Sequence, residues 1–339
     1  MDGRVTLKDV ARQAQVSVMT VSNVINGKFY RVTAETRKRV QAVVEALGYR
    51  ADPAGRSLRL ARRFSIGLII VDPSPTFIAD PYTTFLVAGL SNSLSRKGYG
   101  LLLQGTTLEE LPQVLMLRQS LVDAICIFSS GSAHERRAAY RLVARHREPL
   151  VIFQDSCGAK VKDVLAIRQD DSGGGRMLAQ RLLKDGCRDF VFLTAAHRWP
   201  ALDARERGIR SALRKVDGAS LVVVRAGSED VESVQAALAD RVEHAGLPDA
   251  VFAANDQLAI VAQSWLANHG WTVPHDVKVA GFNAFDSARF WRPKLTTIRS
   301  PAYELGELAA SALLERLESD KFSSREIVLP VALHEGESA

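Results

Sequence analysis

A short segment near the start of the chain carries side chains that can read the edges of DNA bases. It consists of Ser17, Val18, Met19, Thr20, Ser22 and Asn23. The amide of Asn23 can pair with N6 and N7 of adenine, and the apolar side chains of Val18 and Met19 can contact the thymine methyl group. If a helix presents these side chains on its outward face, the segment would enter the major groove of double-stranded DNA.

A second group of polar side chains occurs later in the sequence, next to apolar segments of strand length. Asp155, Asn255 and Asn283 each follow such a segment, and Arg205 lies near the start of an amphipathic one. In open α/β sheets, ligands bind in the crevice outside the carboxyl ends of the strands. A guanidinium, a carboxylate and amides that converge there suit a polyhydroxyl ligand, because each can bridge two neighbouring hydroxyls. For each residue alone, a helix cap or a loop hydrogen bond is an equal alternative.

Capping residues predict a helix-turn-helix for the first group. Thr6-Leu7-Lys8-Asp9 has the pattern of a capping box, which predicts a helix over residues 7–14. Ser17 is an N-cap for a second short helix, which ends at Asn26-Gly27. The residues that can be buried between these helices are Val10, Ala14, Val21, Val24 and Ile25. Their burial leaves the base-reading side chains on the outward face of the second helix.

A third helix, from Thr33 to a C-cap at Gly48, is predicted to complete this small domain. Asp52 and Pro53 could then start a very short helix, which we expect to be disordered until something docks against it. The region is basic: residues 1–63 contain 13 Lys and Arg against 5 Asp and Glu, whereas residues 64–339 carry a net charge of −2. This asymmetry indicates a module that meets a polyanion, with a solvated basic face as the alternative.

The remainder of the chain alternates between strand-like and helix-like segments. The first series has strands at Phe64–Val71, Tyr99–Gln104, Ala124–Phe128 and Leu150–Gln154, and helices at Phe85–Lys97, Leu108–Gln119 and Glu135–Arg147. The second series begins near Val164, with helices at Gly174–Lys184, Ala204–Lys215, Val231–Arg241 and Leu258–Asn268, and strands at Phe190–Leu193, Leu221–Arg225, Ala250–Ala253 and Val277–Gly281. Such alternation predicts an α/β fold with two doubly wound parallel halves.

Other protein classes find little support. The sequence has no G-x-S-x-G, H-E-x-x-H or G-x-x-x-x-G-K-[ST] motif, and its seven histidines form no pair at metal-ligand spacing, so we expect no catalysis, metal or cofactor. Gly173-Gly174-Gly175 precedes a predicted helix, where helix packing is favoured over phosphate binding. Three dispersed cysteines and the absence of a long apolar segment predict a soluble, cytoplasmic protein that contacts no membrane, which argues against an exported solute-binding protein.

Several ordered motifs carry a family resemblance. In the first sixty residues they are Val5–Ala11, Val16-Ser17-x-x-Thr20-Val21-Ser22, Val24–Gly27, Thr36-Arg37-x-x-Val40 and Arg56-Ser57-Leu58; in the body they are Arg205-x-x-Gly208, Val251–Asp256, Pro274–Phe282 and Pro293–Ile298. These motifs resemble the DNA-binding headpiece, hinge and effector-binding core of the LacI/GalR family of bacterial transcriptional regulators. The core of that family is similar to periplasmic sugar-binding proteins, and the resemblance covers nearly the entire chain.

The resemblance implies a ligand-responsive repressor that binds a palindromic operator as a homodimer and responds to a sugar or sugar derivative. A purine- or nucleoside-responsive regulator that needs a corepressor is the alternative. The residues expected to contact DNA are Thr6, Leu7, Ser17, Val18, Met19, Thr20, Ser22, Asn23, Asn26, Tyr30, Thr33, Tyr49, Arg56 and Leu58, the last as a minor-groove wedge. The residues expected to contact the effector are Arg205, Asn255, Asn283 and, with a strand register ambiguous by one residue, Asp155. Many relatives have Asp where Asn283 stands, so no particular sugar is implied.

The resemblance also predicts the domain boundaries. A headpiece over residues 1–50 and a hinge over 51–63 would precede a core over 64–339. Because the chain crosses between the two halves of the core three times in the family, subdomain 1 is expected over 64–163 and 295–322, and subdomain 2 over 164–294 and 323–339.

Overall fold

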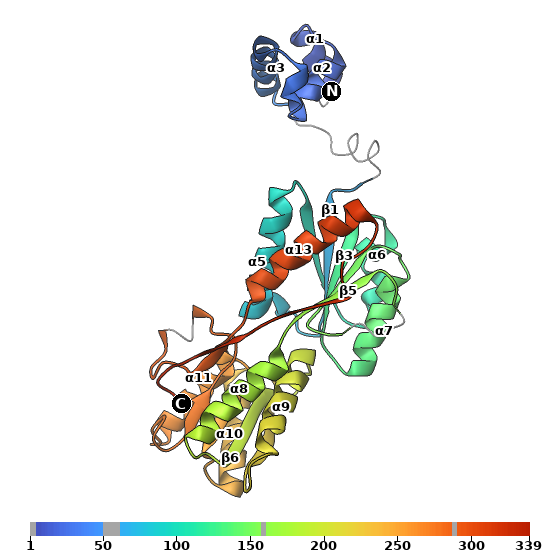
Figure 1. Ribbon diagram of the computed structural model, residues 1–339. Helices are drawn as coiled ribbons and strands as arrows, with labels where there is room; N and C mark the ends of the chain where they lie inside the picture. Colours follow the sequence, from blue (N-terminus) through green and yellow to red (C-terminus); the bar gives the residue numbers. More distant parts are fainter. Residues whose placement is uncertain (1–4, 50–61, 157–160, 287–289) are drawn as a thin grey trace. The chain divides into compact units, whose positions relative to one another are not determined.

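The computed structural model describes residues 5–49, 62–156, 161–286 and 290–339 (Figure 1). The chain divides into two units, Met1–Arg63 and Phe64–Ala339, and each has its own buried core. Two of the predicted DNA contacts, Arg56 and Leu58, and the short helix expected after Asp52 lie outside the described residues.

Within residues 5–49, the first unit contains three α-helices and a 3-10 turn. α1 covers Leu7–Gln13, α2 covers Val18–Ile25, η1 covers Phe29–Arg31 and α3 covers Ala34–Ala46. Each α-helix begins at its predicted cap, because the side chains of Thr6, Ser17 and Thr33 accept a hydrogen bond from the backbone N–H three residues further on. The predicted helix-turn-helix and the third helix are therefore confirmed.

An apolar core holds these helices together. Its buried members are Val10, Ala11, Ala14, Val21, Val24 and Val40. Ile25, which was expected to be buried, is only partly so and packs at the margin of this core. The side chain of Arg39 in α3 contacts the end of α1, where its Nε donates to the backbone oxygen of Ala14 at 3.0 Å. α2 consequently has one face in the core and another that stays accessible.

A six-stranded parallel sheet forms the first half of the second unit. In spatial order its strands are β11 (Glu326–Leu329), β5 (Val164–Gln169), β4 (Leu150–Phe153), β3 (Ala124–Ser129), β1 (Ser65–Val71) and β2 (Gly100–Thr106). Nearly every residue of β1 and β3 is buried, which explains why these segments are continuous apolar runs. α5 (Pro81–Arg96) and α13 (Ala302–Ser319) pack on one face of the sheet and α7 (Ala133–Ala144) on the other (Figure 1).

A four-stranded parallel sheet forms the second half. Its strands are β7 (Ser220–Ala226), β6 (Asp189–Ala195), β8 (Ala250–Ala253) and β9 (Lys278–Ala280), and its helices are α8 (Asp171–Lys184), α9 (Pro200–Leu213), α10 (Val231–Ala245) and α11 (Asp256–Asn268). A short antiparallel pair, β10 (Thr297–Arg299) with β12 (Ala332–His334), lies beside this half. The α/β fold with two parallel halves is confirmed.

Glycines allow α8 and α9 to approach each other closely. A Cβ on Gly175 would lie 2.3 Å from the backbone oxygen of Arg205, and a Cβ on Gly208 would lie 2.0 Å from that of Ser172. Real Cβ atoms do not come this near to backbone, so neither position has room for a side chain. The glycine run at the start of α8 therefore serves helix packing, as the sequence favoured.

The first crossing between the halves lies later than predicted. Residues from Val164 onward were expected in the second half, but β5 pairs with β4, where Val164 lies opposite Leu150. The chain leaves the first sheet only after Gln169, and α8 follows at once. The sequence placed the start of the second series near Val164 without assigning a strand there, and an apolar segment does not specify which sheet it joins.

The two later crossings also differ from the predicted boundaries. Residues 323–339 were expected in the second half, yet β11 extends the first sheet, with Glu326 opposite Ala166. Conversely, the return to the first half was expected from residue 295, yet Leu295 and Ile298 are buried in the core of the second half. The return occurs between β10 and α13, because Ala302 and Leu305 of α13 are buried in the core of the first half.

The segment Leu108–Gln119 is not the single helix that was predicted. It contains a 3-10 turn, Leu111–Gln113, and a four-residue helix, α6, at Leu115–Arg118. Pro112 has no backbone N–H to donate, which prevents a continuous helix through this segment. Among the residues that the structure describes, no helix is long and apolar enough to cross a membrane.

Candidate functional site

The accessible face of α2 carries the side chains that were expected to read DNA. Val18 is 42% exposed and Met19 is 65% exposed, although both are apolar. The hydroxyls of Ser17 and Thr20 lie 2.9 Å apart at the start of the helix, and Nδ2 of Asn26 donates to the backbone oxygen of Ser22 at its end. Neither side chain belongs to the apolar core of this unit, so both are free to contact thymine methyl groups.

The other predicted DNA contacts differ in their availability. Tyr30 is 80% exposed, Asn26 and Thr33 are exposed, and Ser22 and Asn23 are partly exposed. Leu7 and Tyr49 instead pack in part against the apolar core of the headpiece. The hydroxyls of Thr6, Ser17 and Thr33 are engaged in helix caps, which leaves each of them further hydrogen-bonding capacity.

One surface feature of the headpiece escaped the sequence analysis. The guanidinium of Arg37 lies 3.8 Å from the ring centroid of Phe29, and the phenyl ring itself remains partly exposed. This stacking holds a positive charge beside the exposed end of η1. The spacing of the two residues gives no signal, because the 3-10 turn between them was not predicted.

In the second unit, a cavity of about 680 Å³ opens at the carboxyl ends of the strands of both halves. Arg205, Asn255 and Asn283 line this cavity, as predicted. Its volume lies in the range of typical small-molecule sites, which is about 300–1,000 Å³. The structure therefore brings together three of the four polar residues singled out from the sequence.

Arg205 is positioned by three contacts with the protein itself. Its Nε donates to Oδ1 of Asp171 at 2.9 Å, and one of its terminal nitrogens donates to the backbone oxygen of Ala254. Its guanidinium also lies 3.7 Å from the ring centroid of Phe282. The side chain is buried, and two of its five N–H donors are already used within the second half.

A hydrogen-bonded network links this arginine to the crossings between the halves. Nε2 of Gln169 donates to the same Asp171 oxygen at 2.8 Å, and the hydroxyl of Ser300 donates to Oε1 of Gln169 at 2.6 Å. Gln169 ends β5 and Ser300 follows β10, so both residues belong to connecting segments. Arg205 is thus linked through Asp171 and Gln169 to two of the segments that connect the halves.

The two asparagines of the cavity have different hydrogen-bonding states. Oδ1 of Asn255 accepts from the backbone N–H of Leu258 at 2.9 Å, so this side chain is the N-cap of α11. Oδ1 of Asn283 is buried and has no hydrogen-bond partner, and the residue adopts a φ of 121°. A buried acceptor without a partner is costly, and it is available for a ligand hydroxyl or amine.

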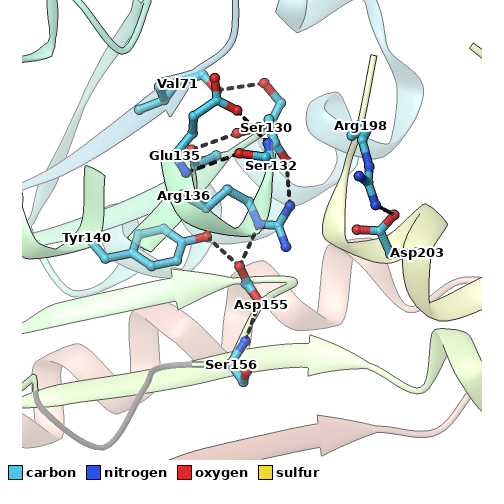
Figure 2. A network of polar contacts seen from close by, with 12 residues as sticks. Val71, Ser130, Ser132, Glu135, Arg136, Tyr140, Asp155, Ser156, Arg198 and Asp203 are labelled. Carbon is cyan, nitrogen blue, oxygen red and sulfur yellow. Dashed lines mark hydrogen bonds and ion pairs between the residues drawn. The ribbon is translucent and has the colours of Figure 1, made fainter. Parts of the chain in front are cut away.

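Asp155 does not belong to the cavity, which corrects the prediction. Its Oδ2 accepts from Nε of Arg136 at 2.7 Å and from the hydroxyl of Tyr140 at 3.1 Å, as Figure 2 shows. The preceding residue, Gln154, lines the cavity instead. β4 ends at Phe153, and Gln154 adopts a φ of 59°, so the residue facing the cavity is one position earlier than predicted.

The sequence analysis missed five acidic or basic residues of the cavity: Asp72, Asp80, His197, Glu229 and Asp230. Asp72 follows β1 in the first half and His197 follows β6 in the second, and their side chains approach to 3.1 Å between Oδ2 and Nε2. The hydrogen bond with Asp72 raises the pKa of His197. Asp72 and His197 each come shortly after a predicted strand, so their position gave a usable signal.

Aromatic rings form part of the cavity wall. The rings of Phe128 and Trp199 lie 4.4 Å apart between centroids, and Tyr82 lies 6.0 Å from Phe128. All three residues line the cavity. Such rings offer apolar faces to the carbon skeleton of a ligand. No group of three or more His, Cys, Asp or Glu side chains suited to a metal ion occurs in the described part of the chain.

Two family models match the chain. Residues 6–52 match the bacterial regulatory proteins of the lacI family, and residues 179–339 match a periplasmic binding protein-like domain. The first match covers the three-helix unit, and the second covers most of the second half together with the C-terminal strands.

Known proteins are similar over nearly the whole chain. The HTH-type transcriptional repressor PurR of Salmonella arizonae is 30% identical over 332 residues, which are 95% of this chain and 93% of that protein. The ribose operon repressor of Escherichia coli K12 is 29% identical over 343 residues, or 98% and 99% of the two chains. A solved structure described as the transcriptional regulator CelR-cellobiose complex is 27% identical with a TM-score of 0.72, and the match covers 99% of this chain and 100% of the other.

Proposed function

The chain belongs to the lacI family of bacterial regulatory proteins, and from this membership we infer a transcriptional repressor whose binding to DNA responds to a small ligand. Its relatives are repressors rather than enzymes. The observation that carries the proposal is the pairing of two sites in one chain. One is the exposed N-terminal face of α2, and the other is the polar cavity at the strand ends of the second unit.

We propose that α2 enters the major groove and that two copies of the chain bind a palindromic operator. A single headpiece offers few base-reading side chains, chiefly Val18, Met19 and Asn23. Two headpieces related by a two-fold axis double these contacts and match the symmetry of a palindrome. The predicted hinge residues Arg56 and Leu58 would add contacts in the minor groove.

We propose further that the cavity binds a sugar-like effector. Arg205, Asn255 and Asn283 face it, and buried Asn283 has an acceptor without a partner. The aromatic wall would pack against a sugar ring. Ribose and cellobiose in the names of similar proteins support this class, and the similarity to PurR keeps a purine as the second candidate.

Two measurements test the proposal. Binding-site selection with the full chain should return a palindromic sequence, and a variant lacking residues 1–63 should bind no DNA but keep effector binding. A thermal-shift screen of sugars, polyols and nucleobases should identify a compound that also changes operator affinity. Selection of no sequence, or DNA binding by the truncated variant, would reject the role of the headpiece; stabilisation by a nucleobase alone would favour the purine reading.

A further inference from the structure

The cavity has carboxylates on both of its walls. Asp72 directly follows β1 and Asp80 is the N-cap of α5, so both belong to the first half. Glu229 lies after β7 in the second half. All three line the cavity. This distribution means that a ligand held between the halves meets negative charge from two sides.

The positive charges of the cavity are already balanced. Of the described residues that line it, only His197 and Arg205 can be cationic. Arg205 forms its ion pair with Asp171, and His197 forms one with Asp72. Asp80 and Glu229 have no basic side chain as an ion-pair partner within the described residues, so the cavity retains an excess of negative charge.

The excess charge has an electrostatic cost in the ligand-free protein. Partial removal from water together with the charges of Asp80 and Asp72 raises the pKa of Glu229, a residue that is still exposed to solvent in the ligand-free protein, and burial raises the pKa of Asp80. Like charges on opposite walls repel each other across the cavity. A positive group between the walls would relieve this repulsion, whereas a phosphate or carboxylate would increase it.

Unpartnered polar atoms indicate that a ligand completes this site. Oδ1 of Asn283 and the hydroxyl of Tyr82 both lack a hydrogen-bond partner, and their residues are only 6% and 5% exposed. Both side chains line the same cavity as the carboxylates. Oδ1 of Asn283 can only accept, so it suits a ligand donor such as an amine or a hydroxyl.

The aromatic wall favours the same kind of ligand. Tyr82, Phe128 and Trp199 form a continuous series of rings in the cavity. A cation near the face of such rings is attracted by their quadrupole. Anionic ligands gain nothing from these rings, and neutral sugars gain only packing.

We propose that the effector is a cationic amino sugar, whose ammonium group lies between Glu229 and the acidic wall formed by Asp72 and Asp80. The hydroxyls of the ring then form hydrogen bonds with the polar side chains around Asn283 and Arg205. This inference rests on the proposed function, because it specifies the ligand of the same cavity.

The test compares matched compounds on the full-length chain by isothermal titration calorimetry. Glucosamine, galactosamine and mannosamine are each compared with the neutral parent hexose and with the parent's 6-phosphate. At least one amino sugar should bind tenfold or more tighter than its parent, because a charge-assisted hydrogen bond is gained, while the phosphates should not bind. Glu229→Gln should weaken the binding of that amino sugar by about tenfold or more and leave the binding of the neutral parent unchanged.

Glu232→Gln is the control, since Glu232 is an exposed carboxylate of the neighbouring helix that does not line the cavity. It should leave all affinities unchanged. Tighter binding of a neutral hexose or a phosphate, or an equal loss in both variants, would overturn the inference while leaving the proposed function intact. Failure of every amino sugar overturns it too, and failure of all sugars counts against the proposed effector class as well.

Discussion

Nε of Arg205 lies 2.9 Å from Oδ1 of Asp171, and both side chains are almost completely buried, with exposed fractions of 6% and 3%. The pair links the cavity to a segment that connects the halves. Arg205 lines the cavity, and Gln169 at the end of β5 donates to the same Asp171 oxygen. An arginine expected only to contact the effector therefore also supports the ligand-free protein.

Arg205→Ala should lower the free energy of unfolding by about 3–5 kcal/mol, because it leaves a buried carboxylate without its partner. Urea denaturation measures this change. The control is Arg210→Ala on the same helix, where a partly exposed pair with Glu206 should contribute less than about 1 kcal/mol. Equal effects of the two substitutions would show that Asp171 does not depend on Arg205.

Asn283→Gly should separate ligand binding from stability. Glycine accepts a φ of 121° more readily than asparagine does, and it removes a buried oxygen that lacks a partner. The thermal midpoint should stay the same or rise, whereas calorimetry should show a loss of effector affinity. A lower midpoint together with normal affinity would contradict the assignment of this side chain to the ligand.

Gly208→Ala should push α8 and α9 apart, because the new Cβ would meet the backbone oxygen of Ser172. Overpacking of this kind costs about 1–3 kcal/mol of stability. Gly227→Ala is the control, since a Cβ there meets nothing within 4 Å. Chemical denaturation of the two variants should differ accordingly; the packing argument fails if both are as stable as the parent.

Asp256 should make stability depend on pH near neutrality. Burial raises its pKa to about 7, although Thr297 donates to the carboxylate at 2.6 Å. Between about pH 4 and 7 the native state holds a proton that the unfolded chain has lost, so the free energy of unfolding falls as pH rises, by up to about 4 kcal/mol. Asp256→Asn should flatten this dependence, and the exposed control Asp240→Asn should not. If the free energy of unfolding of Asp256→Asn depends on pH as it does in the parent, the assignment to Asp256 is wrong.

Asn23 should select adenine in each half-site. Asparagine pairs with N6 and N7 of adenine, whereas arginine pairs with guanine. Asn23→Arg should therefore change the selected base from adenine to guanine, with about 1–3 kcal/mol of discrimination against the wrong base. Met19→Ala should instead relax a thymine preference at a neighbouring position without changing stability, since Met19 is exposed. Binding-site selection with the three proteins tests both statements, and a guanine selected by the unchanged protein contradicts the first.

The sequence predicts structure well where a local signal determines it. α2 spans Val18–Ile25 as expected, because Ser17 and Asn26 bound it with side-chain hydrogen bonds that are readable from three or four neighbouring residues. Asp155 shows where local signals end. A change of one residue at the end of β4 moved its carboxylate from the cavity to Arg136, and no periodicity specifies such a register.

Residues distant in sequence caused the other differences. The approach of Asp72 to His197 joins the ends of two strands from different halves, and the pairing of β11 with β5 joins the end of the chain to its middle. Neither relationship leaves a pattern within a window of the sequence. Both depend on how completed halves fit together, which only the folded structure reveals.

The pairing of β5 with β11 has a consequence for the synthesis of the chain on the ribosome. Glu326, the partner of Ala166 in the sheet, is synthesised about 160 positions later, and only then can β11 add the last strand to the first sheet. At translation rates of about 5–20 residues per second, this interval lasts roughly 8–30 s. During that time the edge of β5 is open, and open strand edges recruit other chains. The nascent protein is therefore exposed to aggregation in this interval, and chaperones that bind unfinished chains should raise its yield.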